Sequence, residues 1–160
     1  MDSRKILVVD DEQDLTFLIS EILQREAGGH EIHVVNSGEE AMRKFVEIKP
    51  DVVFLDYIMP DVKGDDVLEF INNNHGERTP AVILMSGLGE RIYFKNRGAM
   101  DWSSVLGPDD SKGRDFGASV DCAWRKVAGQ MAERFNVRAF MSKPFSRSDI
   151  LDVLKCVLSG

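Results

Sequence analysis

Three apolar runs in this chain each end in side chains that can do chemistry. The runs are Ile6–Val9 before Asp10 and Asp11, Val52–Leu55 before Asp56, and Ala81–Met85 before Ser86. Short apolar runs bounded by turn residues are typical of buried strands, and Pro60 stops the second run from continuing. If these strands are parallel, their carboxyl ends meet at one sheet edge, where open α/β sheets bind ligands.

Carboxylates gathered at one edge require a positive partner. Unit charges about 4 Å apart repel by about 4 kcal/mol at an effective dielectric constant of about 20. Carboxylate oxygens at a hydrated edge suit Mg²⁺, which takes one or two protein carboxylates and keeps several waters. Lys143, shortly after a further predicted strand at 137–141, would supply the other positive charge. We therefore predict Mg²⁺ as the cofactor.

This combination of groups favours phosphoryl transfer to a carboxylate, in which charge on the moving group must be neutralised. Asp56 would be the nucleophile and form an acyl phosphate. Lys143 would bind phosphoryl oxygens together with Mg²⁺, and Ser86 would donate a hydrogen bond. Taken singly, each residue has a simpler interpretation, since aspartate and serine are common in turns and lysine is common on surfaces.

The elements that must position these groups alternate between strand and helix. A helix through 15–23 ends at Gly28 and Gly29, and a second strand covers 32–35. Ser37 to Glu40 predicts a capping box, Gly64 is expected to relax the turn into a third helix, and Ser146 can cap the last helix. The alternation predicts an α/β fold, a doubly wound five-stranded parallel sheet with helices on both faces.

The stretch between Ser86 and Lys143 is longer than one helix and two loops need, by about thirty residues. Helical spacing predicts the fourth helix at 119–134, so the surplus falls at about 88–118. The chain of 160 residues, 43% of them hydrophobic, is expected to form a single domain over 1–160 with this insertion.

Composition narrows the function further. A formal charge of -7 argues against sequence-independent nucleic-acid binding. No apolar stretch is long enough for a signal peptide or a membrane span, and Cys122 and Cys156 lack metal-ligand spacing. We expect a cytoplasmic protein without a direct nucleic-acid or membrane partner.

Four ordered blocks resemble the receiver domain of two-component response regulators, over residues 4–87 and 119–158. They are Val8-Val9-Asp10-Asp11-Glu12, Asp56-x-x-Met59-Pro60-x-x-x-Gly64, Ser86-Gly87 and Lys143-Pro144-Phe145. This family includes chemotaxis regulators. The resemblance to it implies a flavodoxin-like sheet with strand order 2-1-3-4-5.

The resemblance also implies roles for single residues. Asp10, Asp11, Asp56 and the backbone carbonyl of Ile58 would bind Mg²⁺. Asp56 would accept the phosphoryl group from a histidine kinase or a phosphotransfer protein. Lys143–Pro144 would be a cis peptide.

In similar receivers a hydroxyl and an aromatic ring switch together, which here are Ser86 and Phe140; an aromatic residue in a strand can also be plain core. The downstream protein partner would dock on the face formed by the helix at 119–134, the strand at 137–141 and the final helix. The insertion at 88–118 would alter or shield that face. The chain would be a signalling phosphoacceptor in a phosphorelay and not an enzyme, with slow self-dephosphorylation because Ile58 and Leu88 cannot place a water.

Two alternatives remain open. An aspartyl-phosphate hydrolase of the haloacid-dehalogenase type uses similar groups, but its Asp-x-Asp nucleophile region would place Glu12 where the second aspartate is needed. The other alternative is a degenerate receiver that binds partners without phosphate. The intact acidic pair, Asp10 and Asp11, argues against it.

Overall fold

The computed structural model describes residues 3–87, 93–94 and 134–159, which build one sheet with strand order β2-β1-β3-β4-β6-β5. The elements are β1 (Lys5–Val9), α1 (Gln13–Ile22), the π-helical turn η1 (Leu23–Ala27), β2 (Glu31–Val35), α2 (Gly38–Ile48), β3 (Val52–Asp56), α3 (Gly64–Asn74), β4 (Ala81–Ser86), β5 (Tyr93–Phe94), β6 (Val137–Ser142) and α6 (Arg147–Leu158). The strands from β2 to β6 in this order are parallel, which confirms the predicted five-stranded α/β sheet and its order.

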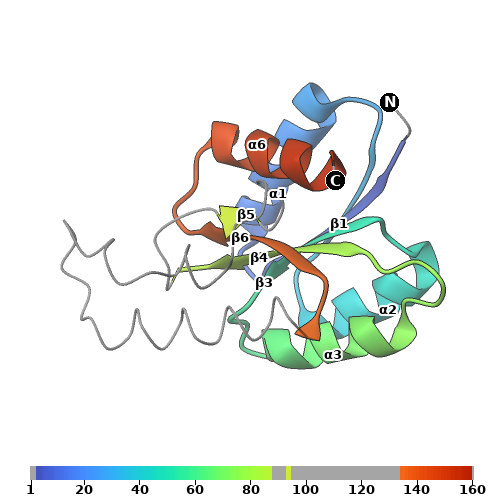
Figure 1. Ribbon diagram of the computed structural model, residues 1–160. Helices are drawn as coiled ribbons and strands as arrows, with labels where there is room; N and C mark the ends of the chain where they lie inside the picture. Colours follow the sequence, from blue (N-terminus) through green and yellow to red (C-terminus); the bar gives the residue numbers. More distant parts are fainter. Residues whose placement is uncertain (1–2, 88–92, 95–133, 160) are drawn as a thin grey trace, which may run out of the picture.

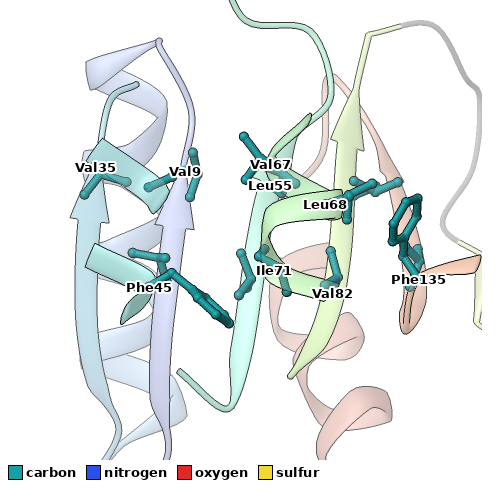
Figure 2. Close-up of a cluster of buried hydrophobic side chains, with 14 of the residues drawn as sticks. Val9, Val35, Phe45, Leu55, Val67, Leu68, Ile71, Val82 and Phe135 are labelled. Atoms are coloured by element: carbon teal, nitrogen blue, oxygen red, sulfur yellow. The ribbon is translucent and has the colours of Figure 1, made fainter. Parts of the chain in front are cut away.

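Helices cover both faces of the sheet, with α1 and α6 on one side and α2 and α3 on the other (Figure 1). Neighbouring residues of a strand therefore enter different cores: Leu7 packs on the α2 and α3 side, and Ile6 packs on the α1 and α6 side. Figure 2 shows the first core, where Phe45 of α2 and Ile71 of α3 lie over the strands. Burial on both faces explains why β1, β3 and β4 are nearly continuous apolar runs in the sequence.

Strand β5 was not predicted. Its two residues pair antiparallel with β6, opposite Ala139 and Phe140. They fall inside the predicted insertion at 88–118. The rest of that segment and residues 119–133 of the predicted helix lie outside the described residues. Pairing with β5 covers part of the free edge of β6, which would otherwise offer unpaired backbone groups to another chain.

The predicted helix caps are correct in part. Ser37 Oγ accepts a hydrogen bond from Glu40 N (3.2 Å), but Glu40 Oε2 accepts from Asn36 N (3.2 Å) and not from Ser37 N. The capping box predicted there is therefore wrong in its second half. Ser146 caps α6 as predicted and forms a complete capping box with Asp149.

Glycines act in two ways along the chain. Gly28 has φ 48° and Gly29 has φ 78°, which confirms the predicted left-handed stop after the first helix. Gly64 is not in the left-handed region. It is needed for space, because a Cβ atom there would lie 2.7 Å from the carbonyl oxygen of Tyr57. The expectation that Gly64 relaxes a turn is therefore wrong. A glycine is needed there because two backbone segments approach closely.

Among the described residues, no helix is both long and apolar enough to cross a membrane.

Candidate functional site

Carboxylates and one ammonium group meet at the carboxyl edge of the sheet. Asp10 and Asp11 follow β1, Asp56 ends β3, and Lys143 follows β6. One carboxylate oxygen from each of the three aspartates lies within 4.8 Å of the others. The parallel direction of the strands produces this meeting, because it brings all their carboxyl ends to one edge.

The Lys143 ammonium joins the acidic groups. Its Nζ lies 2.7 Å from Asp10 Oδ2, 3.2 Å from Glu12 Oε1 and 3.6 Å from Asp56 Oδ2. Burial lowers the pKa of Lys143, but Asp10, Asp56 and Glu12 outweigh that effect and raise it. Lys143 was expected in the site, whereas its contact with Glu12 was not. The signal available in the sequence was the position of Glu12, directly after Asp10 and Asp11.

Asp10 is fully buried and incompletely satisfied. Its Oδ1 accepts a hydrogen bond from Glu12 N (2.9 Å), and its backbone oxygen accepts one from Asn36 Nδ2 (2.8 Å). Its Oδ2 lies 2.7 Å from Lys143 Nζ as an ion pair and accepts no other hydrogen bond among the described residues. A buried carboxylate oxygen in this condition is suited to a further cation.

Asp56 is only 3% exposed, and its pKa is raised to about 7. Burial is the main cause and the charge of Asp10 adds to it, while Lys143 and the hydrogen bond from Ile58 N (3.3 Å) oppose them. One lysine therefore does not compensate the acidic groups. The donor set is all oxygen, and Asp11 is exposed at its rim, so these residues fit a hard divalent cation that keeps part of its water.

Tyr57 anchors the loop between Asp56 and α3. Its N donates to Met85 O (2.9 Å), and its carbonyl accepts from Gly64 N (3.1 Å). Its pKa is raised to about 12 by burial, by a hydrogen bond to Asp65 and by the charge of Asp65. Sequence reasoning assigned no role to Tyr57 or Asp65, and the pairing of these two side chains has no signature in the local sequence.

Asp61 ties the same loop to the start of α2. Its Oδ2 accepts hydrogen bonds from Gly38 N (2.9 Å) and Glu39 N (3.3 Å). Burial acts to raise its pKa, but the backbone donors Val62, Glu39 and Gly38 outweigh that and lower it. Sequence reasoning also missed this contact, although Asp61 directly follows the Met59-Pro60 pair.

The expected switch residues lie on neighbouring strands. Ser86 ends β4 and is 3% exposed, and its carbonyl accepts from Lys143 N (2.8 Å). Phe140 pairs in register with Leu84 and belongs to the core on the α2 and α3 side. The Lys143–Pro144 peptide is cis. Ile58 is 54% exposed beside the site, and Leu88 lies outside the described residues.

Comparison with known proteins gives one family. The family model of the response regulator receiver domain matches residues 6–102. The transcriptional regulatory protein TrcR of Mycobacterium tuberculosis is 34% identical over 100 residues, 61% of this chain and 38% of that protein. A protein-glutamate methylesterase/protein-glutamine glutaminase of Archaeoglobus fulgidus is 31% identical over 155 residues, 94% of this chain and 40% of that protein. The chain thus spans less than half of each of these relatives.

Solved structures agree on the fold. A receiver domain from Bermanella marisrubri superposes with a TM-score of 0.64 at 22% identity, covering 98% of this chain and 99% of that one. The BeF3-activated DrrB receiver domain has a TM-score of 0.63 at 23% identity, covering 99% of this chain and 100% of that one. With the family match over more than half of its length, this chain belongs to the response regulator receiver domain family.

Proposed function

We propose that this receiver domain is a phosphorylation-controlled binding module in a two-component system. Asp56 accepts a phosphoryl group, in a reaction that depends on Mg²⁺, from a histidine kinase or a phosphotransfer protein. The observation that carries the proposal is the Lys143 ammonium, which lies within ion-pair distance of both buried aspartates, Asp10 and Asp56. This cationic group is placed where a phosphoryl oxygen on Asp56 would need one.

Asp10, Asp11, Asp56 and the backbone carbonyl of Ile58 would hold Mg²⁺, which supplies positive charge against the phosphoryl oxygens when bound. In the transfer, an Asp56 carboxylate oxygen forms a bond to phosphorus as the bond from phosphorus to the donor's imidazole nitrogen breaks. The electron pair of that bond stays on the imidazole, which takes up a proton. Lys143 then pairs with one phosphoryl oxygen, and the Ser86 hydroxyl donates to another.

The output is a change in binding surface, and the chain turns over no substrate other than its own phosphate. Ser86 and Phe140 would move together when the phosphate arrives, which shifts an equilibrium between two states. The partner surface would include β6 and α6, together with residues 119–134. The transcriptional-regulator and methylesterase names of the relatives describe those longer proteins.

The phosphate on Asp56 should be lost slowly. Ile58 is 54% exposed beside the acceptor and is apolar, so it cannot hold the attacking water. We therefore expect the aspartyl phosphate to survive much longer than seconds. Decay after labelling with a small phosphodonor measures this, and a lifetime of seconds would contradict it.

The direct test is labelling with acetyl phosphate followed by mass spectrometry of peptides. With Mg²⁺ present we expect one phosphoryl group on Asp56, and none after chelation or in Asp56→Asn. Asp152→Asn, at an exposed position of α6, is the matched control and should be labelled like the parent. A label on Asp10 would support the hydrolase alternative, and a parent protein that never labels would support a phosphate-independent receiver.

A further inference from the structure

The opposite edge of the sheet, where the strands begin, carries a cavity of about 200 Å³. Its charged lining consists of Arg4 before β1, Arg78 before β4, Arg138 in β6 and Asp51 before β3. Val157 and Leu158, at the end of α6, contribute apolar surface. The cavity lies at the other end of the strands from Asp56 and shares no residue with that site.

The aspartate in this cavity does not balance the arginines. Asp51 Oδ1 accepts from Arg78 (2.9 Å) and lies 3.5 Å from Arg4, and its Oδ2 accepts from Lys5 N (3.0 Å). Arg138 donates from Nε to Asn136 Oδ1 (3.1 Å), a neutral acceptor, and pairs with no carboxylate among the described residues. Three guanidinium groups facing one carboxylate leave an excess of two positive charges.

We propose that this cavity binds a small phosphate monoester. Such a group is close to a dianion above its second pKa of about 6, which matches the charge excess. Guanidinium groups bind phosphate oxygens through paired N–H donors, and Arg138 has donors that the Asn136 contact leaves available. The apolar side chains of Val157 and Leu158 would contact the organic part of the ligand.

The carboxyl end of α6 lies at this cavity and carries the negative end of the helix dipole, which opposes an anion. Its effect is reduced because Ser159 covers one of the last carbonyls: both its N (3.0 Å) and its Oγ (2.6 Å) donate to Lys155 O. The simpler interpretation is that Arg4 and Arg78 are exposed partners of Asp51 and bind nothing else. It gives no reason for Arg138 to line the same cavity.

The test is an NMR titration of the whole chain in EDTA, which keeps cation-dependent binding at Asp56 out of the measurement. The probes are phenyl phosphate, inorganic phosphate and benzyl alcohol. We expect saturable shifts of the Ala81, Val157 and Leu158 methyl groups with phenyl phosphate, weaker binding of inorganic phosphate and no saturable shift with benzyl alcohol.

Variants separate a built site from general attraction. Arg138→Gln should weaken phenyl phosphate binding about fivefold or more. Arg147→Gln, at the other end of α6 and paired with Glu26 (2.5 Å), is the matched control and should leave binding unchanged. No saturable shift in the parent, equal affinity for both phosphates, binding of benzyl alcohol, or equal weakening by both variants would overturn the proposal.

Discussion

The two edges of the sheet carry opposite versions of one ion-pair arrangement. At the carboxyl edge, several carboxylates surround one lysine, and Asp10 has 0% of its side chain exposed. At the amino edge, three arginines and one aspartate line a cavity, two of the arginines pair with the aspartate, and the Arg78 side chain is 77% exposed. The central groups are similarly exposed, at 18% for the Lys143 side chain and 16% for that of Asp51, so the main difference is the burial of the groups that pair with them.

That difference decides what each edge can do. Charges withdrawn from water interact strongly and are costly when uncompensated, so the carboxyl edge can bind a cation and stabilise a charged phosphoryl group. Charges in contact with water are screened, so the amino edge can attract an anion but perturbs it little. The predictions below test this contrast, beginning with the largest effect.

Removing one cationic side chain from each edge should lower the stability of the protein by clearly different amounts. Lys143→Ala should lower the free energy of unfolding by about 3–5 kcal/mol in EDTA, because it leaves Asp10 buried without its partner. Arg78→Ala should lower it by about 1 kcal/mol or less, because that arginine is largely exposed. Urea unfolding of both variants measures the difference, and equal losses would show that burial does not set the strength of these pairs.

The pH dependence of stability should reveal the free-energy cost of ionising the buried Asp56 carboxylate. Its pKa is about 7 in the folded protein and near 3.8 when unfolded, so its favourable contribution exists below pH 3.8 and is lost as pH rises through 7. Asp56→Asn removes this loss. In EDTA the variant should be more stable than the parent by about 2–4 kcal/mol at pH 8, with a difference that shrinks toward pH 4.

Mg²⁺ provides the control for that experiment. Saturating Mg²⁺ should stabilise the parent at pH 8 more than it stabilises Asp56→Asn, since the cation favours the ionised carboxylate. A difference between the two proteins that does not change with pH would contradict the assigned pKa.

The close approach of Gly64 to Tyr57, next to the site, should leave no room for a side chain at position 64. Gly64→Ala places a Cβ atom 2.7 Å from Tyr57 O and should cost about 2 kcal/mol of stability. The shifted loop should also weaken Mg²⁺ binding, which isothermal titration calorimetry can follow. Gly87→Ala is the matched control: a Cβ atom there meets nothing within 4 Å in the described part of the chain, so both quantities should stay close to those of the parent.

Replacing Asp61, which lies at the same edge of the sheet, should have the smallest effect on stability, with a pH dependence opposite to that of Asp56. Asp61→Ala should cost about 0.5–1 kcal/mol at pH 7, the usual value of an exposed cap reduced by solvent screening. Because the folded pKa of Asp61 is lowered, its contribution is present above the unfolded pKa of 3.8 and is lost as pH falls through the folded value. Unfolding at pH 7 and at pH 3 should show the difference narrowing in acid; a constant difference would count against ionised capping.

The sequence by itself determined the α/β class, the order of the blocks and the residues that form the acidic cluster. Those conclusions depend on local information: apolar runs such as 52–55, the residue that ends each run, and the caps at Ser37 and Ser146. Parallel pairing then brings Asp10, Asp56 and Lys143 to one edge whatever the loops contain.

Only the tertiary structure decided the contacts between segments distant in sequence. The Asp61 cap on Gly38, the pairing of β5 with β6 and the cavity that joins Arg4, Arg78 and Arg138 all arise this way. The burial that raises the pKa of Asp56 also belongs here. Periodicity and turn signals are local, so they identify a strand or a helix but carry no information about which distant side chain shares its space or how much water reaches it.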